Sequence, residues 1–258
     1  MRWQPDPYHY HPLYGAANPY PSFFPQRESS DRLVKIETIQ GREGAVIYRY
    51  KNAVIFKSDM DIDIDGDPAA YHPNRRLAKT DFNVHAIAKD ERGRLCPVQR
   101  QGDPHPGYYP SGTSLYDFTY WLQNRCDPRA YVDPNVYPYF VLPYPHYKDP
   151  KWGPVRIGDL GVVINTKNGK MAYAIFADAF LGHFIGEGSL ALARELGIDD
   201  NPNTGGEETK SIIYLVFPGS GKGQGTVPSI EEIRQTAAQY FNAWGGQAQV
   251  EAIQGQLR

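Results

Sequence analysis

Two acidic residues stand at the two ends of a short loop within the stretch from Met171 to Ile198. Asp178 follows an apolar run, Ala172 to Ala177, whose aromatic, β-branched and small residues predict a β-strand. Glu187 ends the loop and directly precedes a predicted helix. A carboxylic acid and a carboxylate held in this way could act on opposite faces of a sugar, which is the chemistry of glycoside hydrolysis. A structural interpretation is also open, with Asp178 capping a turn and Glu187 favouring the helix dipole.

Rigid elements are needed to hold such a pair. Ser189 is a good N-cap residue and Gly197 is typical of a helix end, so we predict a helix between them. The segment TKNGK contains an Asn-Gly turn signal, which predicts a hairpin between residues 156–165 and 170–178. Antiparallel pairing would then bring Asp159 to the same rim as Asp178, so Asp159 is a third candidate carboxylate. Asn165 and Ser189 could orient the acids or a water molecule.

A second acidic stretch, SDMDIDIDGDP, alternates aspartate with apolar residues. On a strand, successive side chains point to opposite faces, so one face would be apolar and the other a row of carboxylates. Like charges spaced about 7 Å apart repel one another, so a cation should face them. The aspartates of this row are Asp59, Asp61, Asp63, Asp65 and Asp67.

Several cations could face this row. An EF-hand calcium loop does not fit, because the twelfth position from Asp61 is His72 and no helix precedes it. A nucleotide-sugar site with a divalent ion does not fit, because the chain shows no series of βαβ units for a nucleotide-binding domain. A polycationic substrate fits, and so does a divalent-metal enzyme centred on Asp61, Asp63 and Asp65. The acids could also simply pair with nearby Arg75, Arg76 and Lys79.

The composition indicates a β-rich protein with many loops. The 258 residues include 25 Gly and 22 Pro, more than a helical bundle would use. The long loop from Gln101 to Tyr116 offers Tyr108, Tyr109, Ser111 and Thr113 as candidates for a substrate wall. The formal net charge of -2 indicates neither a nucleic-acid nor an anionic-membrane partner. We therefore predict a mainly β, α+β fold: a mixed β-barrel with two or three helices packed outside.

The order of segments completes the prediction. Residues 1–30, rich in Tyr, His and Pro, should form an extended arm, and residues 31–250 a single catalytic domain. Cys96 and Cys126 allow one disulfide or two free thiols. Neither a signal peptide nor an apolar run of membrane-spanning length is visible, and the location stays unknown. Further predicted strands span residues 33–39, 44–50, 53–56, 81–89, 95–99, 139–142 and 211–217, and a capped helix lies between Ser229 and Gly245.

Three blocks of the chain carry a family resemblance. They read DMDIDIDG (59–66), VDPNVYPYFVLP (132–143), and GDLGVVINTKNGKMAYAIFADAF followed by FIGEGSLALARELGI (158–198). With these blocks in this order, the chain resembles the chitosanases of glycoside hydrolase family 75 over roughly residues 32–245. In that family, the Asp of an A-[IV]-x-x-D strand and the Glu of an I-G-E-x-S segment are the essential pair. These positions match Asp178 and Glu187.

The resemblance implies endo-hydrolysis of β-1,4-linked glucosamine polymers with inversion, without a metal cofactor, and a barrel that could be of the double-psi kind. It implies a polysaccharide partner, with no nucleic acid or membrane, and we expect a monomer. The aspartate row would attract the protonated amines of the polymer. We expect Glu187 to be the general acid, its pKa raised by Phe184 and Ile185, and Asp178 the base; the reverse stays open because a helix N-terminus favours ionised Glu187. Alternatives are a noncatalytic glycan-binding relative and the metal enzyme described above.

Overall fold

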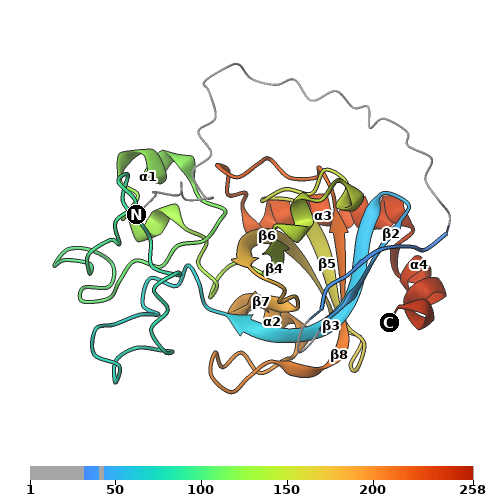
Figure 1. Cartoon of the computed structure of the whole chain (residues 1–258), viewed down its shortest axis with the longest axis horizontal. Helices are drawn as coiled ribbons and strands as arrows, with labels where there is room; N and C mark the ends of the chain where they lie inside the picture. Colours follow the sequence, from blue (N-terminus) through green and yellow to red (C-terminus); the bar gives the residue numbers. More distant parts are fainter. Residues whose placement is uncertain (1–31, 41–43, 258) are drawn as a thin grey trace, which may run out of the picture.

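A computed structural model describes residues 32–40 and 44–257 (Figure 1). The predicted arm at residues 1–30 lies outside the described residues. The strands are β1 (Val34–Thr38), β2 (Val46–Tyr50), β3 (Ala53–Asp63), β4 (Tyr139–Tyr144), β5 (Leu160–Asn165), β6 (Met171–Leu181), β7 (Glu187–Ser189) and β8 (Glu207–Phe217). The helices are α1 (Phe118–Gln123), α2 (Leu190–Leu196), α3 (Ile230–Trp244) and α4 (Gly246–Ile253), with short 3-10 turns η1 (Pro128–Ala130), η2 (His146–Lys148), η3 (Pro150–Trp152) and η4 (Gln254–Gln256).

Six strands close into a mixed barrel. Their order is β3-β7-β4-β6-β5-β8, and β8 pairs with β3 to complete the ring. The pairs β3–β7 and β4–β6 are parallel, whereas the other four are antiparallel. Strands β1 and β2 extend the sheet from β3. The mixed barrel predicted from the sequence is confirmed, while its double-psi connectivity and the single-domain boundary stay predictions.

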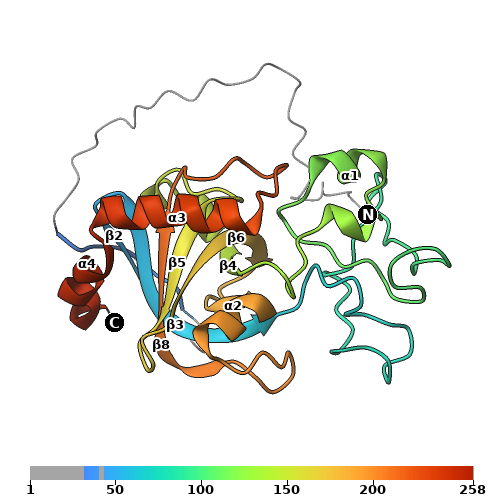
Figure 2. The ribbon, with the colours of Figure 1, turned by 180° about the vertical axis from the view of Figure 1, so that it is seen from behind.

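Both faces of the central strands are buried, as the continuous apolar sequence of β8 predicts. Along β8, Tyr214 and Val216 face the barrel interior, whereas Ile213 and Leu215 pack under the helices. Figure 2 shows α3 lying across one side of the barrel, with α4 beside it. The predicted helix caps are confirmed: Ser189 Oγ accepts from Leu192 N–H at the start of α2, and Ser229 Oγ accepts from Glu232 N–H at the start of α3.

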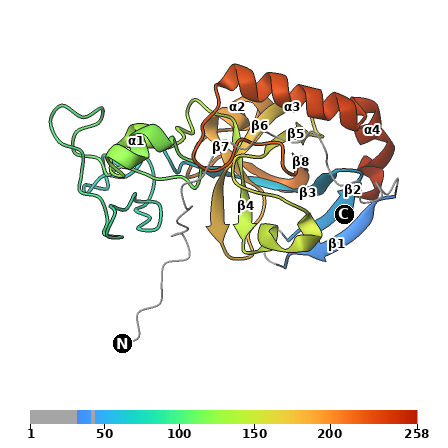
Figure 3. The ribbon, with the colours of Figure 1, turned by 90° about the horizontal axis from the view of Figure 1, so that it is seen from above.

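The chain between β3 and β4 is a long excursion that projects from one side of the barrel (Figures 1 and 3). Here the predicted strands 81–89 and 95–99 do not form, but the predicted turn between them does: Lys89 and Leu95 form an antiparallel bridge, and Asp90 N–H donates to Arg94 C=O. Ala86 and Ile87 are buried in a small cluster that includes Leu190 of α2, and the disulfide between Cys96 and Cys126 ties the excursion together. The two cysteines are thus joined, one of the two options left open by the sequence.

Two element boundaries differ from the prediction and matter for the site. Strand β3 runs to Asp63 rather than ending near Phe56, because its acidic half pairs with β7. Glu187, expected in the loop, is the first residue of β7. Within the described ranges, none of the helices combines the length and apolarity that a membrane crossing requires.

Candidate active site

Strand register places acidic residues in one row across neighbouring strands. Asp61 of β3 pairs with Glu187 of β7, Glu187 pairs with Val141 of β4, and Val141 pairs with Asp178 of β6. Paired residues on adjacent strands project to the same face of a sheet. With one strand between them, the backbones of Glu187 and Asp178 lie about 10 Å apart, twice the usual strand spacing.

A β-bulge turns Asp178 toward this row. Phe140 pairs with Phe176 and Val141 with Asp178, so Ala177 is the extra residue on β6. The carbonyl of Ala177 accepts a hydrogen bond from Leu115 N–H at 2.7 Å. Because side chains alternate along a strand, the same strand without the bulge would have turned Asp178 to the other face.

A cavity of about 200 Å³ opens over the row and is lined by both predicted catalytic residues. A smaller hollow beside it also includes Glu187, so Glu187 borders both spaces. Four acids with half-buried side chains converge on the larger cavity: Asp63, Asp65, Asp178 and Glu187. The smaller hollow contains Asp59, Asp61, His183, Phe184 and Ile185.

Asp178 is held by one residue of the long loop. Its Oδ1 accepts from Ser114 N–H at 2.8 Å and from Ser114 Oγ–H at 2.6 Å. Burial raises the pKa of Asp178 to about 6, while the hydrogen bonds from Ser114 act in the opposite direction. Asp178 is therefore ionised at neutral pH, as a general base must be.

The surroundings of Glu187 favour its protonated form. Burial raises its pKa well above the usual value, and the charges of Asp63, Asp61, Asp178 and Asp59 raise it further. Ile185 is buried beside it, but Phe184, expected to shield it, is 55% exposed. The raised pKa favours the general-acid role, which requires a proton at working pH.

Gly186 sets the approach of Glu187 to β3. Its φ of +105° suits glycine, and a Cβ there would lie 2.3 Å from Asp59 Oδ1. The backbone contact is tight because Gly186 C=O accepts from Asp61 N–H at 2.7 Å. The glycine of the I-G-E segment is therefore needed for the parallel pairing of β7 with β3.

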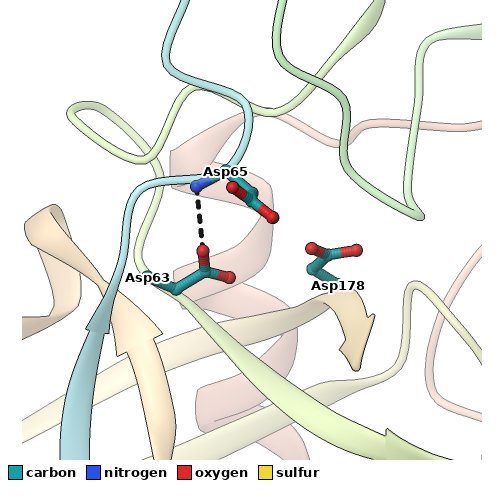
Figure 4. Close-up of side chains that lie close together, drawn as sticks. All are labelled: Asp63, Asp65 and Asp178. Carbon is teal, nitrogen blue, oxygen red and sulfur yellow. Dashed lines mark hydrogen bonds between the residues drawn. The ribbon is translucent and has the colours of Figure 1, made fainter. Parts of the chain in front are cut away.

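The predicted aspartate row is only partly a strand ladder. Strand β3 ends at Asp63, and a turn folds Asp65 back so that its N–H donates to Asp63 Oδ1 at 2.8 Å. Figure 4 shows Asp63, Asp65 and Asp178 pointing toward one another, with one oxygen from each within 4.8 Å of the others. Tyr71 OH donates to Asp65 Oδ1 at 2.7 Å. Asp67 points elsewhere and is buried against Lys79 and Asn135.

This proximity changes the protonation of the cluster. Burial, followed by the charge of Asp178, raises the pKa of Asp65 to about 8. Burial and the charges of Asp65 and Asp178 raise the pKa of Asp63 well above its usual value. The three carboxylates are also the residues that could hold a divalent cation, since oxygen ligands suit such ions. Asp178 thus takes the place that the sequence analysis assigned to Asp61.

The groove would repel anions. Among the described residues that line the two cavities, none is Lys or Arg. Asp81 adds another carboxylate to the larger cavity. An anionic ligand would meet acids from several strands, whereas a cationic or neutral one would not be repelled.

Several candidate residues lie outside both cavities. Tyr108 OH donates to Leu77 C=O, and Tyr109 packs against Phe82. Ser111 and Thr113 are buried, and their hydroxyls bond backbone groups. Their role in a substrate wall stays a prediction.

The barrel residues that were expected to assist the acids have structural contacts instead. Asp159 is fully buried and accepts from the N–H groups of Arg156, Gly219 and Gly221. Asn165, at the far end of β5, donates to Leu196 C=O. Ser189 caps α2 and donates to Tyr137 C=O.

Other residues of the site were not found from the sequence. The excursion supplies Ser114, Tyr71 and Asn83 to the site, and the loop before β8 supplies Pro202. Ser114 lies in the loop singled out as a binding segment, but nothing in the sequence distinguished it from Ser111. Tyr71 and Asn83 carried no signal because their placement depends on long-range packing of the excursion.

Asp178 and Glu187 line an open groove at the ends of barrel strands, and the pKa of each is raised. Such a site suits acid–base chemistry on a neutral or cationic substrate. The family described as "Fungal chitosanase of glycosyl hydrolase group 75" matches residues 60–243. The chain belongs to this family, glycoside hydrolase family 75, and is a chitosanase-like enzyme. A search of curated proteins finds no match.

Proposed function

We propose that the protein cleaves β-1,4-linked glucosamine polymers internally, with inversion, using Glu187 as general acid and Asp178 as general base. The observation that carries this proposal is the shared groove: both carboxyls line one cavity, with strand β4 between their strands. Inverting enzymes leave roughly 6.5–9.5 Å between the carboxyls for a water molecule. A backbone spacing of about 10 Å allows such a gap.

The proton movements follow from the strongly raised pKa of Glu187 and the pKa of about 6 of Asp178. Glu187 donates its proton to the glycosidic oxygen as the bond to the anomeric carbon breaks. Asp178 takes a proton from water, whose oxygen attacks that carbon from the opposite face. Ser114 keeps Asp178 ionised and fixes its orientation. The products are two shorter chains, and the pair of carboxyls has exchanged protonation states.

Two features of the groove suit a polymer of glucosamine. The acid row attracts ammonium groups, each of which carries a positive charge on the protonated polymer. Phe180 and Phe184 stand edge to face with centroids 5.6 Å apart, and they are 41% and 55% exposed at the two cavities. Exposed aromatic faces pack well against the C–H faces of sugar rings.

The cluster of Asp63, Asp65 and Asp178 supports a second candidate, a divalent-metal-dependent hydrolase. Cleavage of chitosan that survives EDTA supports the metal-free proposal, whereas loss restored by a divalent cation supports the second candidate. A noncatalytic relative would bind the polymer without releasing reducing ends.

The decisive experiment measures reducing-end release from chitosan and follows the anomeric configuration of the first product by NMR. We expect Asp178→Asn and Glu187→Gln each to lower kcat by about 10²–10⁴-fold, the range for loss of a general acid or base. Glu208→Gln, an exposed acid of β8, is the matched control and should retain full activity. Retention of activity in either groove variant, or a retained anomeric configuration, would overturn the proposal.

A further inference from the structure

Outside the carboxylate row, a chain of polar side chains runs from strand β1 to the smaller hollow. Glu37 Oε1 lies 2.6 Å from His146 Nδ1, and His146 Nε2 lies 2.9 Å from His183 Nδ1. His183 lines the hollow that also contains Glu187. The three residues come from β1, from the turn η2 after β4, and from the loop after β6.

The fold explains why these residues meet. Strands β4 and β6 are parallel neighbours, with Tyr144 paired to Leu181 at their ends. The residues that follow them, His146 and His183, therefore emerge at the same edge. A bulge in β1 at Ile36 separates the pairings of Lys35 and Glu37 and re-aims the strand just before Glu37.

A buried tryptophan fixes the inner end of the chain. Trp152 is fully buried, and its Nε1–H donates to Glu37 Oε2 at 2.8 Å. The other oxygen, Oε1, accepts from His146 Nδ1–H. When both imidazoles are neutral, His146 Nε2 is the acceptor and His183 Nδ1–H donates to it. His183 Nε2 carries a lone pair in that state.

The outer nitrogen of His183 remains for a ligand. The His183 side chain is exposed, and its Nε2 has no hydrogen-bond partner within residues 32–40 and 44–257. A glucosamine unit offers hydroxyl and ammonium donors, which match a lone pair. Since His183 lies between Asp178 and Glu187 in the chain, the same contacts restrain the loop that joins the two acids.

We propose that Glu37 and His146 are positioning residues that hold His183, and that His183 Nε2 accepts a hydrogen bond from a sugar unit bound beside Glu187. This inference rests on the proposed function for the identity of the sugar. It assigns substrate binding to a histidine and its support to two residues outside the groove.

The test has two measurements. One is the kinetics of cleavage of a glucosamine hexamer, and the other is the binding of the same hexamer by proteins that also carry Glu187→Gln. We expect His183→Ala to raise KM and Kd three- to tenfold, the usual effect of one lost hydrogen bond, with a smaller change in kcat. His183→Asn, which keeps a side-chain acceptor, should recover part of the loss. His85→Ala, an exposed histidine outside both cavities, is the matched control.

The supporting role of His146 has its own measurements. His146→Gln should raise KM like His183→Ala, and the double variant should be no worse than His183→Ala alone, because one residue acts through the other. Without any ligand, backbone amides of residues 182–186 should exchange faster in His146→Gln than in the wild type or in His85→Ala. Additive effects in the double variant, or unchanged exchange, would overturn the positioning role.

The outcomes separate this inference from the proposed function. If the wild type cleaves the hexamer and His183→Ala has unchanged KM and Kd, the His183 contact is wrong and the carboxylate pair stands. If the wild type binds the hexamer without cleaving it, the hydrolase proposal fails while the Kd values still decide on His183. If it neither binds nor cleaves the hexamer, both are overturned.

Discussion

Asp178 and Asp159 lie near the same end of one hairpin, β5–β6, yet they are used differently. Burial raises the pKa of each to about 6. Asp159 is fully buried, and three backbone N–H groups saturate its oxygens. Asp178 is only partly buried at an open cavity, and both hydrogen bonds it accepts go to Oδ1.

The difference shows that a raised pKa does not by itself identify a catalytic carboxylate. The Asp159 carboxyl closes a glycine-containing loop, and its hydrogen bonds leave no room for a substrate. The Asp178 carboxyl keeps Oδ2 available toward the groove. Satisfaction of hydrogen bonds, together with access, distinguishes the structural acid from the catalytic candidate.

The largest expected effect is a loss of kcat when the charge of Asp178 is removed, with no such loss when the charge of Asp159 is removed. Asp178→Asn should reduce kcat by about 10²–10⁴-fold, since a general base is lost, and should leave the melting temperature unchanged or higher because it relieves repulsion from Asp63 and Asp65. Asp159→Asn should keep kcat near the wild-type value per folded molecule. Reducing-end assays and thermal melts on the same preparations check both. Equal loss of kcat in the two variants would show that Asp178 and Asp159 do not differ in role.

Deleting the carboxyl group of Asp159 should instead destabilise the protein. Asp159→Ala leaves the buried N–H groups of Gly219, Gly221 and Arg156 without an acceptor, which costs about 2–3 kcal/mol. For a chain of this size we expect the melting temperature to fall by roughly 5–10 °C. Asp178→Ala is the matched control. A melting temperature that falls equally in both would show that Asp178 is also a structural acid.

The same contrast shows what a sequence can predict. Helix caps at Ser189 and Ser229 and the TKNGK turn act within a few residues, so they were predicted correctly. The sequence placed Asp159 at the Asp178 end of the hairpin, but it did not show that Asp159 is buried, because its partners, Gly219 and Gly221, lie some sixty positions away in a loop whose course depends on the closed barrel.

Residues between β3 and β4 were the hardest to predict. Residues 81–89 were predicted as a strand, but the segment lies in an excursion joined by the Cys96–Cys126 disulfide. Site residues from this excursion, such as Ser114, depend on how it folds back on the barrel. Asp178 and Glu187 were singled out because they stand at the ends of locally predictable elements, whereas their supporting residues depend on tertiary contacts.

A smaller effect concerns stability against pH. Asp65, Asp178 and Asp159 all have pKa values above those of an unfolded chain, so the folded state holds more protons than the unfolded chain between about pH 4 and 8. Stability should therefore be greatest at acidic pH and fall as pH rises through about 6 and then 8. Asp65→Asn should flatten the fall above pH 6, whereas Asp159→Asn should flatten only the part below about 6. Thermal melts from pH 4 to 9 test this, and stability that rises over that range would contradict it.

The smallest effect should be a shift in the acidic limb of the activity profile. Ser114 Oγ–H donates to the ionised form of Asp178, and both hydrogen bonds from Ser114 lower its pKa toward about 6. Ser114→Ala removes the hydroxyl but keeps the N–H donor, so the pKa of Asp178 should rise. Because the base must be ionised, kcat/KM should fall several-fold near pH 5.5 and stay close to wild type above pH 7.5. Asp159→Asn, whose carboxyl lies outside the groove, is the control and should not shift the acidic limb. If Asp159→Asn shifts the limb, or if Ser114→Ala does not, the limb belongs to an acid other than Asp178.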